Sequence, residues 1–295
     1  MNGRYIEFAV SECESGMNIG DLLRSKGFSA RRIARLKRTE NGISADGCHA
    51  RTTDTVKTGT VISLFIAEEG KAPEPSPGLL KLAPVRYEDD DVIVFAKPAG
   101  MPVHTSAKHR DDTLENVFAC VCGGMAFRPV NRLDRDTSGL AAAAKNAFAA
   151  ASLQKSLTKT YFAAAEGHIF GNGRIYLPIA REQESIITRC VREDGKPAET
   201  TYSVIKRGYS ADGAPHTLLA CRLGTGRTHQ IRVHFSHLGH PLAGDDMYGG
   251  SMKNIGTQAL HCGEISFADP VSGRVITLTE PLPDEINNLF AKGMI

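Results

Sequence analysis

The 295-residue sequence contains no tryptophan, and only 6% of its residues are aromatic. It also lacks any apolar run near the roughly 20 residues that cross a bilayer. The first ten residues, MNGRYIEFAV, do not have the apolar stretch of a signal peptide. These absences argue against a membrane protein and against a secreted one.

Cysteine pairs at regular spacing are absent as well. The seven cysteines are scattered, and Cys120 and Cys122 form a lone C-x-C with no second pair at the spacing of a zinc ribbon. An odd number of cysteines without a secretory signal is typical of free thiols in a reducing compartment. We therefore expect a cytoplasmic protein without a structural metal.

A large excess of charge of one sign is also missing. Lysine and arginine number 35 against 33 acidic residues, so the formal net charge is only +2. The hydrophobic fraction of 41% is ordinary for a globular protein and allows a full core. Nucleic-acid binding depends on where charge is placed rather than on its sum, so this total excludes little.

One stretch has the composition of a linker. Residues 70–78, GKAPEPSPG, contain three prolines and no large apolar side chain, which favours an extended path. We predict a small α/β unit over residues 1–70, a linker over 71–84 and a larger unit over 85–295.

The small unit carries a cluster of basic residues in predicted helices at 18–24 and 30–37. Gly27 separates the helices and Ser29 can cap the second, while 61–66 is typical of a strand after a turn at 56–59. No acidic residue interrupts the basic window, whose arginines are Arg24, Arg31, Arg32, Arg35 and Arg38. A merely soluble basic face is the simpler interpretation. The functional one is a surface that follows RNA phosphates.

This order of elements resembles the S-four-like RNA-binding domain, named after a small-subunit ribosomal protein. Ser29-Ala-Arg-Arg-Ile33 is similar to its basic helix, and Asp54-Thr-Val-Lys-Thr-Gly59 to its turn. The resemblance is looser at Ile43-Ser-Ala-Asp-Gly47, where that domain usually has a Val-Asn-Gly turn.

The larger unit alternates short apolar strands with glycine-rich turns. Strands are predicted at 91–96, 198–205, 217–223 and 275–278, and the alanine-rich segment 140–157 is predicted as one long helix. Because strands and helices do not alternate regularly, we expect an α+β fold, with a mixed, largely antiparallel central sheet and flanking helices.

The chemistry is concentrated in Asn131-Arg-Leu-Asp-Arg-Asp-Thr-Ser-Gly139. A guanidinium near a carboxylate favours its ionised form. On extended backbone Asp134 and Asp136 point to opposite sides, so one can face a pocket while the other anchors the loop. Thr137 and Ser138 can cap the helix expected next. A salt-bridged turn without function is an equal alternative from composition alone.

Arg132-Leu-Asp-Arg-Asp-Thr-Ser-Gly139 resembles the signature of RluA-type pseudouridine synthases, and further similar segments follow in the family's order. They are Tyr87-Glu-Asp-Asp-Asp91, Ala96-Lys-Pro-Ala-Gly-Met-Pro-Val-His104, Lys159-Thr-Tyr161 with Gly167, Gly226-Arg-Thr-His-Gln-Ile-Arg-Val-His234, Gly239-His-Pro-Leu-Ala-Gly-Asp245, Gln258-Ala-Leu-His261 and Pro281-Leu-Pro-Asp284. Together they extend over essentially all of residues 85–295. One departure is Asn131, where the family usually has histidine, and asparagine cannot carry charge.

The resemblance implies the pseudouridine synthase fold and the isomerisation of uridine in structured RNA, ribosomal RNA first and transfer RNA second. The reaction needs no cofactor, and the carboxylate acts as a nucleophile or as a base. The implied catalytic residues are Asp134, Arg232, which would pair with Asp134, and Tyr161, which would stack on the displaced uracil or help with proton transfer. The implied substrate contacts are Arg132, which would fill the gap left by the flipped nucleotide, Leu260 or Ile231 beneath the uracil, and Arg227 and His229 on RNA or the loop.

Three alternatives are weaker. Asp134-Arg-Asp136 could belong to a haloacid-dehalogenase-type phosphatase, but the preceding segment 128–132 is too polar for the strand that such a site requires. Histidines 229, 234, 237 and 240 could bind a metal, but no acidic or thiol partner has suitable spacing. The main alternative is a non-catalytic RNA-binding or ribosome-assembly factor that keeps the fold without the activity, and the presence of Asp134, Tyr161 and Arg232 together counts against it. A monomer without a protein partner is the default expectation.

Overall fold

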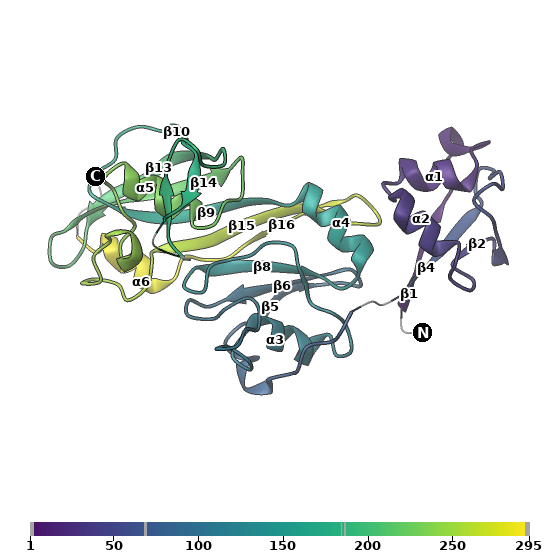
Figure 1. Cartoon of the computed structure of the whole chain (residues 1–295), viewed down its shortest axis with the longest axis horizontal. Coiled ribbons are helices and arrows are strands. Elements are labelled where there is room, and N and C mark those ends of the chain that lie inside the picture. Colours follow the sequence, from purple (N-terminus) through teal and green to yellow (C-terminus); the bar gives the residue numbers. More distant parts are fainter. Residues whose placement is uncertain (1–2, 68–69, 184, 186, 293–295) are drawn as a thin grey trace.

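The computed structural model describes residues 3–67, 70–183, 185 and 187–292. A small N-terminal sheet and a large central sheet lie side by side along the long axis of the molecule (Figure 1). The small sheet has the strand order β1-β4-β2-β3. Its strands are β1 (Gly3–Ala9), β2 (Ile43–Ala45), β3 (Cys48–His49) and β4 (Val61–Ala67), and its helices are η1 (Glu12–Glu14), α1 (Ile19–Ser25) and α2 (Ala30–Leu36).

The helix α2 begins at the predicted residue, and α1 begins one residue later than predicted, because Asn18 is its cap. The side chain of Asn18 accepts a hydrogen bond from the backbone of Asp21, and Ser29 does the same for Arg32. Gly27 separates the two helices with a φ of 86°, a left-handed conformation that favours glycine. Leu22, Leu23 and the strand residue Leu64 are buried together, so the unit has its own apolar core.

The central sheet contains ten strands and is antiparallel at every pairing but one, which confirms the predicted α+β architecture. Its main path is β10-β13-β14-β9-β15-β8-β6-β5, with β16 beside β15 and β7 beside β8. The bounds are β5 (Val85–Glu88), β6 (Val92–Lys97), β7 (Arg128–Pro129), β8 (Ser138–Ala144), β9 (Thr158–Glu166), β10 (Gly173–Tyr176), β13 (Glu199–Tyr209), β14 (Pro215–Leu223), β15 (Leu260–Ala268) and β16 (Val275–Thr279). A separate hairpin joins β11 (Ile179–Arg181) and β12 (Arg189–Val191).

The helices flank this sheet at its faces and ends (Figure 1). They are α3 (Leu114–Val121), α4 (Ala147–Ser156), α5 (Gln230–His237) and α6 (Asp284–Asn287), with the short 3₁₀ turns η2 (Pro77–Leu79), η3 (Asp246–Tyr248) and η4 (Asn288–Phe290). No helix in the described ranges is long and apolar enough to cross a membrane.

The prediction of one helix over residues 140–157 is wrong. Residues Ser138–Ala144 form the buried strand β8, and only Ala147–Ser156 is helical. Alanine favours helices locally, but a strand enclosed between neighbours and covered on both faces is an uninterrupted apolar run, and here tertiary packing prevails. Asn146 then caps the helix by accepting a hydrogen bond from Ala149. The predicted capping role of Thr137 and Ser138 is wrong for the same reason, since a strand follows them.

The single parallel contact, between β8 and β15, fixes the start of β8. Gly139 faces Cys262 with a φ of 109°, and a Cβ on Gly139 would lie 2.3 Å from the carbonyl oxygen of Cys262. Beside it the hydroxyl of Ser138 lies 2.8 Å from Nδ1 of His261. These contacts hold the start of β8, and with it the end of the preceding loop, against β15.

Three buried histidines make the fold sensitive to acid. Burial lowers the pKa of His216, His234 and His261. Because the unfolded chain then binds protons that the native state does not, the free energy of unfolding falls as the pH drops below about 6.5. The slope is at most about 1.4 kcal/mol per pH unit for each histidine. Urea titrations between pH 8 and 5.5 measure it.

A matched pair of variants assigns this slope. His234→Gln, which removes a buried imidazole, should flatten it, whereas His49→Gln, at an exposed position of β3, should leave it unchanged. Stability that stays constant from pH 8 to 5.5 would rule out this role for the histidines.

Candidate active site

The signature segment forms a loop between β7 and β8. The backbone N–H of Thr137 donates to the carbonyl of Asp134, which closes a turn. Asn131 fastens the loop to β8, because its amide donates to the carbonyl of Leu140 at 3.0 Å and accepts from the N–H of Ala142 at 2.7 Å. A neutral amide satisfies both contacts. Asn131 therefore has a structural explanation that needs no charge at this position.

Asp134 stands at the tip of this loop with two basic side chains on one of its oxygens. Nη1 of Arg232 donates to Oδ2 at 3.1 Å, and Nε2 of His229 lies 3.8 Å from the same oxygen. Oδ1 has no hydrogen-bond partner in the described part of the chain, and the side chain is 28% exposed. One oxygen is thus held by the protein while the other is available to a substrate.

Arg232 links Asp134 to a second carboxylate that sequence analysis gave no role. Its Nε and Nη2 donate to the two oxygens of Asp245 at 2.7 and 2.8 Å in a bidentate pair. The Asp245 side chain is completely buried, and that of Arg232 is 5% exposed. Burial opposes the charge on Arg232, but the pairs with Asp245 and Asp134 outweigh it and raise the pKa of the guanidinium.

The side chain of Lys97 anchors this loop through hydrogen bonds to backbone carbonyls. Its ammonium donates to the carbonyls of Pro98, Met101 and Arg135 at 2.8–2.9 Å, so it joins the end of β6 to the residue after Asp134. Burial lowers the pKa of Lys97 to about 7. Three backbone acceptors match the three donors of an ammonium, and the carboxylates of Asp136 and Asp134 favour the charge.

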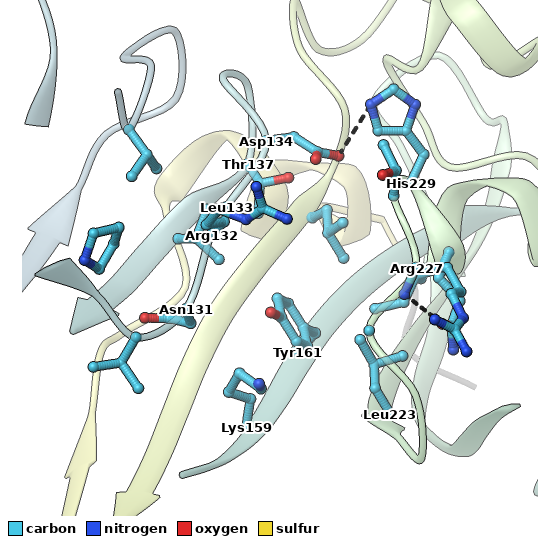
Figure 2. A pocket seen from close by; sticks show the side chains of 18 of the residues that line it. Asn131, Arg132, Leu133, Asp134, Thr137, Lys159, Tyr161, Leu223, Arg227 and His229 are labelled. Carbon is cyan, nitrogen blue, oxygen red and sulfur yellow. Dashed lines mark hydrogen bonds and ion pairs between the residues drawn. The ribbon is translucent and has the colours of Figure 1, made fainter. Parts of the chain in front are cut away.

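A cavity of about 700 Å³ opens between the loop, strand β9 and the segment before α5. Figure 2 shows Asp134 and His229 at one end of it and Lys159 at the other, with Tyr161 between them. This volume falls within the range of small-ligand sites and accommodates a nucleotide.

The apolar part of the cavity contains the predicted stacking residues. Tyr161, Ile231 and Leu260 all line it and are almost completely buried. Burial raises the pKa of Tyr161 well above its usual range, so its hydroxyl stays protonated. That hydroxyl has no partner among the described residues and can bond to a bound base.

The rim of the cavity is basic. Arg132 and Arg227 are exposed there, and Nε of Arg227 donates to the carbonyl of Pro197. Lys159 was missed as a site residue, although it precedes Tyr161 by two positions on a strand and so shares its face. These cations suit a polyanionic substrate.

The N-terminal arginines lie elsewhere. Arg24, Arg31, Arg35 and Arg38 are exposed on α1, α2 and the turn after α2. Arg32 is half-buried: its guanidinium donates to the carbonyl of Ala147 and lies over the ring of Phe148 at the start of α4. Arg32 therefore contributes to the contact between the two units.

The two alternative sites gain no support. Asp134 follows a loop in a largely antiparallel sheet, whereas the phosphatase site requires a strand directly before its first aspartate. His234 is buried, with Nδ1 and Nε2 bonded to Thr200 and Leu177. Within the described ranges, no three histidine, cysteine or acidic side chains gather in a metal-binding arrangement.

Comparison with known proteins places this geometry in context. The sequence model of the RNA pseudouridylate synthase family matches residues 91–237. Ribosomal large subunit pseudouridine synthase D of Xanthomonas campestris is 35% identical over 272 residues, which cover 83% of this chain and 79% of that protein. The uncharacterized RNA pseudouridine synthase YhcT of Bacillus subtilis is 32% identical, and the match covers 97% of each chain. The structure of human RNA pseudouridylate synthase domain containing 1 superposes with a TM-score of 0.58 at 29% identity, covering 73% of this chain and 86% of that one.

Proposed function

Since this chain belongs to the RNA pseudouridine synthases, of the RluA type that its motifs predict, we propose that it modifies ribosomal RNA with Asp134 as the essential carboxylate. The prediction of an enzyme of this class is confirmed, so the non-catalytic alternative is set aside. The observation that carries the proposal is the carboxylate of Asp134 beside the cavity, with Oδ2 held by Arg232 and Oδ1 without a hydrogen-bond partner among the described residues.

The reaction breaks the bond between N1 of uracil and C1′ of ribose and joins C5 to the same carbon. The C5 proton is lost to solvent and N1 takes up a proton, so there is no net redox change and no cofactor is required. Oδ1 of Asp134 is the atom placed to act on the ribose, as a nucleophile at the sugar carbon or as a base. Arg232 orients the carboxylate from the opposite side.

Other residues of the cavity bind the uracil and the RNA around it. Tyr161 stacks on the detached uracil or assists proton transfer through its hydroxyl, while Leu260 and Ile231 pack against the ring. A base paired in a helix is out of reach, so the nucleotide must be flipped out, and Arg132 at the rim fills the gap. Arg227 and His229 contact the RNA backbone or order the loop.

The N-terminal unit supplies affinity in this proposal. As an S-four-like domain it follows phosphates through the exposed Arg24, Arg31, Arg35 and Arg38, with Arg32 holding the helix against α4. Ribosomal RNA is favoured because several of the similar proteins carry the name ribosomal large subunit pseudouridine synthase D. A monomeric enzyme in the cytoplasm completes the proposal.

The test uses ribosomal and transfer RNA transcribed without modifications. After incubation with the enzyme, carbodiimide labelling and reverse-transcriptase stops map each pseudouridine. Stops in ribosomal RNA that are absent with Asp134→Ala support the proposal and identify the uridine. Stops confined to transfer RNA would overturn the choice of substrate, and stops that persist with Asp134→Ala would overturn the role of the carboxylate.

A further inference from the structure

Tyr248, outside all the predicted site residues, contacts two of the groups around Asp134. It ends the 3₁₀ turn η3, and its hydroxyl lies 2.8 Å from Nδ1 of His229. The two rings meet edge to face with centroids 5.7 Å apart. The guanidinium of Arg232 lies 5.0 Å from the centroid of the Tyr248 ring.

The hydrogen bonds around this hydroxyl determine which nitrogen of His229 carries the proton. The backbone N–H of Arg189, on β12, donates to the Tyr248 oxygen at 3.0 Å. Burial raises the pKa of Tyr248 and lowers the pKa of His229, so the pair meets as a phenol and a neutral imidazole. The phenol proton then has Nδ1 as its acceptor among the described residues. A neutral imidazole that accepts at Nδ1 carries its proton on Nε2.

Two contacts, with Tyr248 and with Asp134, disfavour the opposite tautomer of His229, in which Nδ1 carries the proton. With the proton on Nδ1, the Tyr248 oxygen would accept two hydrogen bonds and its own proton would have no acceptor in the described part of the chain. The lone pair of Nε2 would also face Oδ2 of Asp134 at 3.8 Å, and the lone pair and the carboxylate would repel each other. With the proton on Nε2, the same approach is attractive, and such contacts shorten when substrate closes a site.

The backbone of His229 supports a fixed ring position. This residue directly precedes α5. Its backbone has the left-handed conformation, with φ 57° and ψ 21°, which is uncommon for a residue other than glycine. Strained backbone of this kind persists where surrounding contacts determine it and concentrates at functional sites. Gln230 secures the neighbouring turn, since its amide oxygen accepts from the N–H of Arg227 at 3.0 Å.

We infer that Tyr248 is a positioning residue that holds His229 with its Nε2–H toward Oδ2 of Asp134, so that the carboxylate keeps Oδ1 toward the ribose. Arg232 and His229 then secure the same oxygen from two directions. The inference deepens the proposed function and relies on it for its kinetic part, but the tautomer of His229 is a property of the free enzyme.

The first experiment removes only the hydroxyl. Tyr248→Phe keeps the ring against His229 and Arg232, and we expect kcat to fall about tenfold, the effect of one lost hydrogen bond, with KM within about twofold. Tritium release from RNA labelled at uracil C5 measures the rate, because that hydrogen leaves on isomerisation. Tyr87→Phe, whose hydroxyl bonds to Asp89 away from the cavity, is the matched control and should keep full activity.

Two further measurements separate positioning from general damage. Nitrogen NMR of labelled enzyme should show His229 protonated at Nε2 in the wild type and as a mixture of tautomers in Tyr248→Phe. Moreover, Tyr248→Phe should have little effect in a His229→Gln background, because the two residues act through one contact. An Nδ1–H tautomer in the wild type, or additive losses in the double variant, would overturn the inference. A wild type that modifies no RNA but shows the Nε2–H tautomer would instead count against the proposed function.

Discussion

Asp134→Asn should lower kcat for pseudouridine formation by about 10⁴-fold or more, the scale expected when an essential group of this kind is removed. Asparagine is nearly isosteric, and its amide oxygen can still accept the 3.1 Å hydrogen bond from Arg232, so the loop should stay in place. What disappears is an oxygen that can attack the ribose or take its proton. Single-turnover assays with C5-tritiated RNA measure the loss.

Binding and folding should be nearly unaffected by this change. Asp134 is partly exposed and makes one ion pair, so the free energy of unfolding should fall by no more than about 1 kcal/mol. The matched control is Asp136→Asn, two residues along the same loop, whose carboxylate pairs with Arg135 and lies outside the cavity. We expect the control to lose less than about tenfold in kcat, within the range of an indirect effect of one hydrogen bond. Equal losses in the two variants would assign the effect to the loop and not to Asp134.

Arg232→Met should impair both stability and activity. Asp245 has no exposed surface, so loss of the bidentate guanidinium leaves a buried charge unpaired. Breaking such a pair typically costs about 3–5 kcal/mol, which corresponds to a fall in melting temperature of about 10 °C for a chain of this size. Activity should fall as well, because Asp134 loses the donor on Oδ2. Calorimetry and the tritium assay follow the two effects.

A double variant separates these two effects. Arg232→Met with Asp245→Asn removes the stranded charge, so part of the lost stability should return. Activity should not return with it, because Oδ2 of Asp134 still lacks its donor. If the double variant is no more stable than Arg232→Met alone, the unpaired carboxylate is not the source of the instability.

The sequence identified the residues at the centre of this site through their order in recognisable motifs. One cavity is lined by Asp134, Tyr161, Ile231 and Leu260. Arg232, which is not part of the lining, donates a hydrogen bond to Asp134. Local signals were also reliable where the structure depends on neighbours in the chain. The cap at Ser29 is an example, because a cap acts on backbone only a few residues away.

What the sequence could not reveal depends on partners far along the chain. The pairing of Arg232 with Asp134, 98 positions away, was implied only by the family resemblance, and the hydrogen bond from Lys97 to the carbonyl of Arg135, 38 positions away, was not expected at all. The part played by Tyr248 depends on a backbone N–H from residue 189, 59 positions away. Neither residue type nor spacing predicts contacts of this kind.

The alanine-rich segment 138–156 shows most directly the difference between what local composition predicts and what tertiary packing decides. Its composition alone favours a helix, and residues 147–156 do form one. Residues 138–144 instead form a strand, because β6, β7 and β15 offer hydrogen-bonding partners on both sides and bury both faces. The sequence by itself therefore determined the family and the start of α2, whose cap acts within a few residues, and it predicted Asp134 as the reactive carboxylate. Only the tertiary structure decided where strand β8 lies and which groups hold Arg232 and the Asp134 loop in place, because burial and strand pairing depend on the whole chain.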